Sequence, residues 1–454
     1  MIEILLILIF TTCFILNLWK LLSYYDIFSV LIHPLTIISC YFILFYFFPA
    51  FSELLYIPAV FKERFSFSSA EISYTIGLIV FVYAILTLYF LFRKLKNKKN
   101  IKIYDPQKKF LRKKDNFIIE NYILLYIALL LFIFFILCAK FGGIVAVFNN
   151  YTNFVMSVRN GNSGLLYIIY TAELIPIFYL MFSKKVNKFF FTFIFLFSIF
   201  MVAFTGARIL LITILIQIYL ILLIKKSINW KSISVFLLTF LLIFTLMSVM
   251  RSTYSFGDTR SINQTWLDLK GYWTRNMDQF INTLIVIEEI KERNVDFQYG
   301  KTLIDAVFFL TPSQIYPEKP RSYYPSRLIY GDVAASSGQT FNFGIIGRSY
   351  LECGLLGVIV FNILSFMLFL FIFERFIKTK NQCNNIEKTS PHFSFSDFIL
   401  IYIYSHILQV YVLGFSSHVW SYFLLFIIFL FFFFLGYKVF RSFIIGAIRG
   451  DYRY

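Results

Sequence analysis

An arginine stands between two apolar stretches near the middle of the chain, in the segment Thr205-Gly206-Ala207-Arg208. A charged side chain at the centre of an apolar layer costs roughly 2.5 to 3.5 kcal/mol unless it is paired or wetted. Because the break leaves almost no loop, we expect the guanidinium of Arg208 at the edge of that layer. There its planar fork of donors can bind a phosphate. The alternative is an arginine that only anchors a helix end at the interface.

A glutamate lies within another apolar stretch. Glu173 is ten residues into the stretch 164–182, and Pro176 follows it. A carboxylate at that depth either pairs with a buried arginine, or acts as a general base or ligand of a substrate hydroxyl. Both roles stay open, since one side chain can serve them together.

Further charged residues stand at the ends of apolar stretches that we place on one side of the molecule: Arg159, Arg251, Arg348 and Glu352. Together with Arg208, four arginines without a comparable acidic cluster favour a double phosphate as ligand. Arginine stays protonated and binds phosphate oxygens in pairs. For any single arginine, an interface anchor is the alternative. Glu352 joins Glu173 as a candidate base.

Histidine is scarce, with four in the chain. His418 falls in a turn between two apolar stretches, where a proton-transfer role is open to it. We expect His33 and His406 to be packed polar residues and His392 to lie in a loop. Five cysteines without a CxxC pair predict neither a disulfide framework nor a zinc site. No His/Asp constellation has metal-ligand spacing, so we expect a site without metal.

The stretches that position these residues are predicted membrane spans. The 454-residue chain is 59% hydrophobic and 15% charged, with a mean hydropathy of +0.75. It could not cover a globular surface with polar groups, which predicts an all-α polytopic membrane bundle. About eleven stretches can cross some 30 Å of hydrocarbon as helices. They run over 3–19, 28–49, 71–92, 117–139, 164–182, 189–205, 209–224, 232–250, 349–373, 397–413 and 420–437. The first lacks a cleavage signal and is predicted to be retained.

The basic residues predict the orientation of this bundle. With the N-terminus outside, 26 of the 42 lysines and arginines fall on the cytoplasmic side with eight acidic residues, and 16 of each sign remain outside. Cytoplasmic loops carry an excess of Lys and Arg, which favours this orientation. The basic run from Arg93 to Lys114 is therefore interpreted as a topology signal that contacts anionic lipid, in preference to a nucleic-acid site.

One connection is far longer than the others. Residues 251–348 form 98 residues on the predicted external face, with eleven basic and ten acidic residues. Near neutrality excludes an indiscriminate polyanion binder, while its aromatic side chains suit stacking on sugar rings or the lipid interface. Residues 277–293 are predicted to form a helix against the membrane surface. The chain thus divides into a membrane bundle over 1–250 with about eight spans, this loop, and a bundle over 349–454 with about three spans and a basic cytoplasmic tail.

These features resemble the Wzy-type oligosaccharide repeat unit polymerases of O-antigen and capsule synthesis, whose architecture is GT-C-like. The resemblance covers about 159–418, and Ala207 stands where the family often has serine. The residues that carry it are the Gly206-x-Arg208 element, Pro312, Lys319-Pro320, Gly344, Gly347, Glu352, Gly354 and Gly357.

The resemblance implies a metal-independent glycosyltransferase of the bacterial cytoplasmic membrane, with no cofactor and no nucleotide sugar. A growing glycan on undecaprenyl pyrophosphate is transferred en bloc, on the outer face, to a repeat unit on the same lipid. Its partners would be these lipids, the bilayer and a chain-length regulator, and no nucleic acid. The implied site comprises catalytic Glu173, Glu352 and His418, pyrophosphate-binding Arg208, Arg159, Arg251 and Arg348, and glycan-binding Arg275, Lys319, Arg321, Arg327, Tyr323 and Tyr324.

Two alternatives stay open at this point. A flippase for lipid-linked oligosaccharides would spread aromatic and cationic residues over a central cavity, whereas here the external loop concentrates them, and the repeated halves of many transporters are not visible. An O-antigen ligase would share the fold and the donor, but would hand the glycan to a lipid A core.

Overall fold

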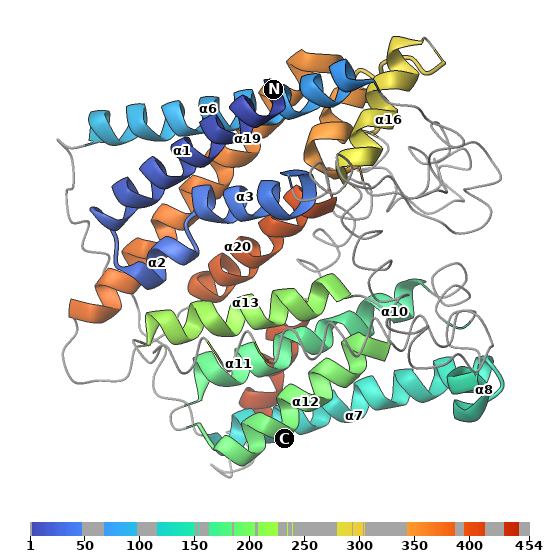
Figure 1. The fold of residues 1–454 in the computed structure, drawn as a ribbon. Helices are drawn as coiled ribbons and strands as arrows, with labels where there is room; N and C mark the ends of the chain where they lie inside the picture. The colour runs from blue at the N-terminus through green and yellow to red at the C-terminus, as the bar shows by residue number, and fades with distance from the viewer. Residues whose placement is uncertain are drawn as a thin grey trace. The chain divides into compact units, whose positions relative to one another are not determined.

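The computed structural model shows a helical protein (Figure 1). It describes residues 2–47, 68–97, 116–149, 154, 163–183, 186–204, 208–225, 234, 238, 279–292, 294–302, 304, 343–385, 395–413 and 431–444, and these contain no strand. The chain forms two compact units, and each unit combines segments from distant parts of the sequence.

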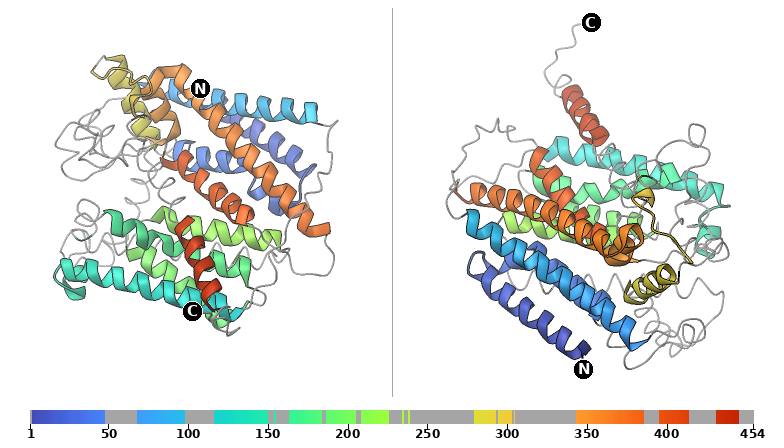
Figure 2. Two further views of the ribbon diagram at one scale, coloured as in Figure 1. Left: turned by 180° about the vertical axis from the view of Figure 1, so that it is seen from behind. Right: turned by 90° about the horizontal axis from the view of Figure 1, so that it is seen from above.

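Unit 1 comprises residues 1–107, 271–377 and 406–421. Its most extensively paired helices are α1 and α6, which lie along each other in both views of Figure 2. Asn17 of α1 donates to Tyr83 Oη at 3.0 Å and to Thr87 Oγ1 at 2.8 Å, so buried polar groups join the two helices. The elements are α1 (Ile2–Leu22), α2 (Ile27–Leu31), α3 (Pro34–Phe42), the π-helical turn η1 (Ile43–Phe47), α6 (Ser69–Asn97), α16 (Gln279–Lys291) and most of α19 (Gly344–Asn385).

Unit 2 comprises residues 108–270, 378–405 and 422–454. Aromatic side chains form much of its core: the rings of Phe178 and Phe433 lie 5.1 Å apart, and Tyr122 Oη donates to the Phe433 carbonyl at 2.6 Å. Its elements are α7 (Asn116–Lys140), α8 (Ile144–Asn149), α10 (Ser163–Tyr170), the 3-10 turn η2 (Thr171–Glu173), α11 (Leu174–Phe182), α12 (Lys188–Phe204), α13 (Arg208–Ile224), the first part of α20 (Phe395–Leu413) and a helix over 431–444.

Among the described residues, four helices are long and apolar enough to cross a bilayer: Leu5–Leu22, Ala70–Arg93, Asn116–Lys140 and Gly344–Thr379. Shorter apolar helices cover Ile168–Phe182, Lys188–Phe204 and Thr213–Ile224. The predicted all-α architecture with several long apolar helices is thereby confirmed. The count of eleven spans stays a prediction, since only residues 234 and 238 of the stretch 232–250 are described. The division into three sequence ranges likewise stays a prediction.

Three predicted spans differ from continuous helices. The stretch 28–49 breaks at His33, whose Nδ1 accepts the Leu35 N–H at 3.2 Å, because Pro34 starts α3 and has no N–H to continue α2. The stretch 164–182 tightens into η2. The span predicted over 349–373 begins earlier, at Gly344. It is interrupted at Cys353 and Gly354, which have non-helical φ and ψ.

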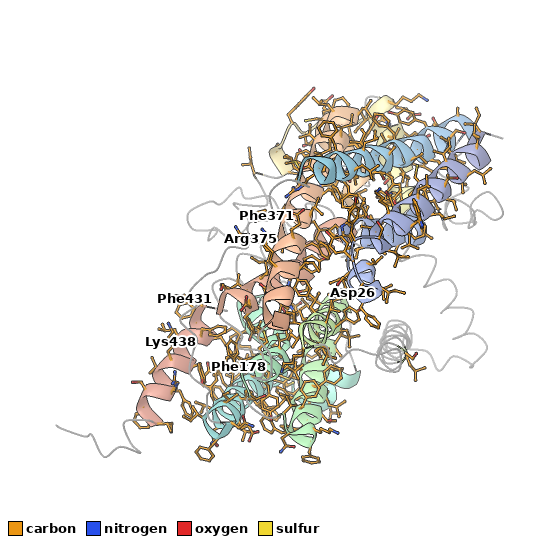
Figure 3. The ribbon with its side chains drawn as sticks, turned by 90° about the vertical axis from the view of Figure 1, so that its left-hand side faces the viewer. Asp26, Phe178, Phe371, Arg375, Phe431 and Lys438 are labelled. Carbon is orange, nitrogen blue, oxygen red and sulfur yellow. The ribbon has the colours of Figure 1, made fainter. Side chains whose placement is uncertain are left out.

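The far part of α19 is tied to α6 by an ion pair. Arg93 Nη2 lies 2.8 Å from Glu374 Oε2. One residue further, the Arg375 guanidinium lies 5.3 Å from the centre of the Phe371 ring (Figure 3). These arginines stand at the ends of their apolar stretches, where positive charge remains in contact with water or lipid headgroups.

Candidate functional site

Two predicted site residues share the first segment of α19. Arg348 is 5% exposed and Glu352 is 1% exposed. Four residues separate them, so they lie one turn apart on the same side of the helix. The structure thus brings a buried guanidinium and a buried carboxylate onto one short helical segment, which ends directly afterwards at Cys353.

Glycines delimit this segment. Gly344 at its start and Gly354 at its end both have a φ of +59°, a conformation in which other residues are strained. Between them, a side chain on Gly347 would place its Cβ 2.8 Å from Thr283 Oγ1 of α16. The glycines that the family resemblance singled out therefore shape both ends of the segment and its contact with α16.

The carboxylate of Glu352 is engaged by the segment that follows α16. The backbone N–H of Gly300 donates to Glu352 Oε2 at 2.7 Å, and the Thr302 hydroxyl donates to Glu352 Oε1. The backbone joins in as well: the N–H of Gln298 donates to the Leu351 carbonyl at 3.0 Å, and that of Tyr299 to the Glu352 carbonyl at 2.8 Å. Carbonyls near a helix end lack donors within the helix, and here residues 298–299 supply them.

The helix α16 lies inside unit 1 beside this segment (Figure 1). The helix predicted over 277–293 is confirmed over Gln279–Lys291, and its residues 279–287 are buried. Its position against the membrane surface stays a prediction. Tyr41 donates to the Gln279 side chain, while Thr283 Oγ1 donates to the Gln279 carbonyl at 2.7 Å. Toward its end, Lys291 Nζ pairs with Glu71 Oε1 at 3.0 Å. The first two turns of α16 are therefore buried, while the charged last turn is partly exposed.

The end of α16 also carries the described acidic side chains of this region. Burial raises the pKa of the Glu288 carboxyl above its usual value, and the neighbouring carboxylates of Glu71, Glu292 and Glu289 raise it further. None of these four glutamates is among the site residues predicted from the sequence.

Glu173 lies in unit 2, at the end of η2, and is fully buried. The turn is tight because Pro176 has no N–H for the carbonyl of Ala172. Ser198 Oγ of α12 donates to that carbonyl instead, at 2.8 Å. Beside it, the Tyr126 and Thr171 hydroxyl groups are hydrogen-bonded at 2.6 Å. Glu173 thus lies at a polar break in an otherwise apolar pair of helices. Ser198 was not predicted from the sequence, because no local pattern marks it.

Arg208 is the first residue of α13, as expected for an arginine at a junction of two spans, but its side chain is not among those described. The remaining predicted site residues fall outside the described ranges: Arg159, Arg251, Arg275, Lys319, Arg321, Tyr323, Tyr324, Arg327 and His418. Their roles stay predictions. His33 and His406 are buried, as predicted for packed residues. Within the described part of the chain, no group of three or more His, Cys, Asp or Glu side chains could hold a metal ion.

Sequence reasoning also missed Thr302, the hydroxyl donor to Glu352. The only local signal is the Tyr299-Gly300 turn just before it, since glycine favours the positive φ of +86° found there. The pairing of Thr302 with Glu352 joins residues 50 positions apart. Such a contact is set by the fold and leaves no spacing pattern in the sequence.

A comparison with known families bears on the chemistry of these residues. The family model described as O-antigen polysaccharide polymerase Wzy matches residues 1–388, which is more than half of the chain. No curated protein and no solved structure matches the chain.

Proposed function

Because the chain belongs to the O-antigen polysaccharide polymerase Wzy family, we propose that it extends a glycan by moving it from one lipid-linked molecule to another. Family membership makes it a multi-pass membrane protein and a polymerising glycosyltransferase that acts on lipid-linked repeat units. The family match is the observation that carries this proposal, and it favours a polymerase over the flippase and the ligase.

In the proposed reaction, the donor is a glycan on undecaprenyl pyrophosphate and the acceptor is a repeat unit on the same lipid. The bond between the anomeric carbon and the pyrophosphate oxygen breaks, and an acceptor hydroxyl forms the new glycosidic bond. The hydroxyl proton passes to a base, and undecaprenyl pyrophosphate leaves with the bonding electrons. The chain grows at its reducing end, and no nucleotide sugar is consumed.

The arginines are proposed to bind the leaving pyrophosphate. Charge on that group grows as the bond breaks, and guanidinium groups held in place beforehand stabilise it more than groups that must reorganise. Arg348 supports this role because it is buried on a short segment fixed at both ends. Arg208, at the start of α13, and Arg159 and Arg251 are proposed as further ligands.

The acceptor hydroxyl needs a base, for which Glu173 and His418 are proposed. Glu173 is supported by its full burial and by the break in its helix, since a broken helix leaves backbone groups open to polar neighbours. Glu352, the third candidate predicted from the sequence, is not included in this proposal, because both of its carboxylate oxygens already accept hydrogen bonds.

The glycan is proposed to rest on the long connection over 251–348, on both sides of α16. Aromatic rings stack on sugars, and cationic side chains donate to their hydroxyl groups. The residues proposed for this are Arg275, Lys319, Arg321, Arg327, Tyr323 and Tyr324.

The site is proposed to face outward, away from the cytoplasm, and the charge distribution of the loops supports this. A reporter fused after Lys109 should then be cytoplasmic, and one inserted near Ser336 external. Both reporters on one side of the membrane would contradict the proposed orientation.

Cells that lack the protein provide the test of the reaction. They should still display single lipid-linked repeat units outside the membrane, because polymerisation follows translocation, and they should contain no polymer. Accumulation of repeat units only on the cytoplasmic leaflet would instead indicate a transporter. Polymer that forms normally but is not attached to its final acceptor would indicate a ligase.

A further inference from the structure

We propose that Glu352 is a positioning residue, whose carboxylate latches residues 297–302 onto α19 and thereby holds the turn that carries Arg348. This rests on the proposed function in one respect, namely the role of Arg348 as a ligand of the donor pyrophosphate. The latch itself is defined by contacts within unit 1.

The residues that form the latch are buried. Glu352 and Thr302 are each 1% exposed. Hydrogen bonds to a charged acceptor are about twice as strong as neutral ones, and a buried carboxylate that loses a donor is costly. The bonds from the Gly300 N–H, at 2.7 Å, and from the Thr302 hydroxyl therefore bind residues 300–302 firmly to α19.

The segment 297–302 has an unusual backbone conformation. Tyr299 has a φ of +47° and Gly300 a φ of +86°, so two successive residues adopt the left-handed conformation. A residue other than glycine rarely does so unless its surroundings require it. Here the turn directs the Gly300 N–H to the carboxylate and the Tyr299 N–H to the Glu352 carbonyl, so side chain and backbone contacts act together.

Arg348 and the latch residue Glu352 share one short helical segment. The helical segment runs without interruption from Gly344 to Glu352, and Arg348 precedes Glu352 by one turn. The break at Cys353 separates this short segment from the long part of α19. The segment is therefore held by its own contacts: Gly347 against Thr283 of α16, and Glu352 against residues 300–302. Loss of the latch would displace Arg348 without removing any group that contacts substrate.

The arrangement also distinguishes the latch from general-base catalysis. A general base must come within hydrogen-bonding distance of the acceptor hydroxyl. Both carboxylate oxygens of Glu352 instead face the protein's own donors on Gly300 and Thr302.

The activity test uses the full chain in lipid nanodiscs with a lipid-linked repeat unit. In E352Q the amide oxygen can accept from Gly300 and the amide nitrogen can donate to the Thr302 hydroxyl, so kcat/KM should stay within about threefold of wild type, with the same pH profile. E352A and T302V should lose on the order of tenfold, while T302S, which keeps the hydroxyl, should not. A loss of about 10²- to 10⁴-fold in E352Q, with the fall in activity at low pH removed from the pH profile, would show that Glu352 is the base and overturn the proposal.

A second readout does not depend on activity. Cys353 is partly exposed and directly follows Glu352, so its reaction with a thiol reagent reports on the break. In a variant whose other four cysteines are alanine, E352A and T302V should raise the labelling rate about fivefold or more, because local opening exposes the thiol. E352Q and T302S should match the parent. Equal labelling in all variants would overturn the latch, whereas increased labelling in a protein without polymerase activity would overturn only the proposed function.

Discussion

Ser198 Oγ donates a hydrogen bond to the carbonyl oxygen of Ala172 at 2.8 Å, across the contact between α12 and η2. This carbonyl is the one that Pro176, four residues later, cannot serve, because proline has no N–H. The same hydroxyl is 2.8 Å from the Ile194 carbonyl of its own helix. A serine on one helix therefore compensates a proline on its neighbour, next to the buried Glu173.

Ser198→Ala should consequently destabilise the protein by about 1 to 3 kcal/mol, since it removes the side-chain donor to a buried carbonyl. Thermal unfolding in detergent would measure this as a lower Tm. Thr192→Ala is the matched control, because the Thr192 hydroxyl donates to the Lys188 carbonyl at 2.9 Å on the exposed side of the same helix. Equal Tm values for the two variants would contradict the role of Ser198.

Gly354→Ala should destabilise unit 1 for two reasons. The backbone of Gly354, with φ +59° and ψ −142°, adopts a conformation that costs about 1 to 3 kcal/mol with a side chain, and the new Cβ would lie 3.1 Å from the Phe297 ring. Gly143→Ala isolates the first cost, since Gly143 also has a positive φ but open space around it. We expect a larger drop in Tm for Gly354→Ala than for Gly143→Ala. An equal or smaller drop would mean that the Phe297 ring moves away from the new Cβ without cost.

The buried Lys225 should make the free energy of unfolding depend on pH. Its ammonium donates to the Leu180 carbonyl in a buried position, and burial lowers the pKa of Lys225 from 10.5 to about 8. Between these two pH values the unfolded chain binds a proton that the folded chain has released. The free energy of unfolding should therefore rise as pH increases from about 8 to 10.5.

Comparing Tm across this pH range in wild type and Lys225→Met isolates the contribution of this lysine. The wild type should gain stability relative to the variant as pH rises. Lys188→Met, at an exposed lysine, serves as the control and should follow the wild type. A difference between wild type and Lys225→Met that stays constant over the range would contradict the lowered pKa.

Arg208 is predicted to bind the donor pyrophosphate through paired contacts. Arg208→Lys keeps the charge but loses the planar fork, so activity should fall nearly as far as in Arg208→Ala, by about a hundredfold. Polymer length and protein level in membranes are the measurements. Arg375→Lys, at the exposed arginine beside Phe371, should leave polymer length unchanged. Full-length polymer from Arg208→Lys would show that Arg208 contributes at most a positive charge, without paired contacts to the pyrophosphate.

Much of the fold was predictable because membrane spans are marked by long apolar stretches. The helix predicted over 277–293 is observed as α16 over Gln279–Lys291, and its predicted C-terminal end lies two residues beyond the observed one. Residues 277 and 278 fall outside the described part of the chain. The breaks within spans were harder to predict, because a single proline or glycine has several outcomes: Pro34 splits a span, whereas Pro176 tightens a turn that Ser198 then completes.

The candidate site shows the same limit. Charge at the end of an apolar stretch was enough to single out Arg348 and Glu352, and both are buried on one segment. The partners of Glu352 were not predictable, because Thr302 and Gly300 lie about fifty residues away and meet it only after folding. What distinguishes a positioning carboxylate from a catalytic one is its partners, and the spacing of residues contains no information on them.

In the proposed reaction, this chain alone joins lipid-linked glycans and releases undecaprenyl pyrophosphate. The direct measurement uses the purified chain in nanodiscs with undecaprenyl-pyrophosphate-linked repeat units and no nucleotide sugar, and counts both new glycosidic bonds and released undecaprenyl pyrophosphate. We expect a ladder of polymers, with one undecaprenyl pyrophosphate released for each bond formed. Polymer that appears only after a nucleotide sugar is added, or carrier release without bond formation, would contradict the claim.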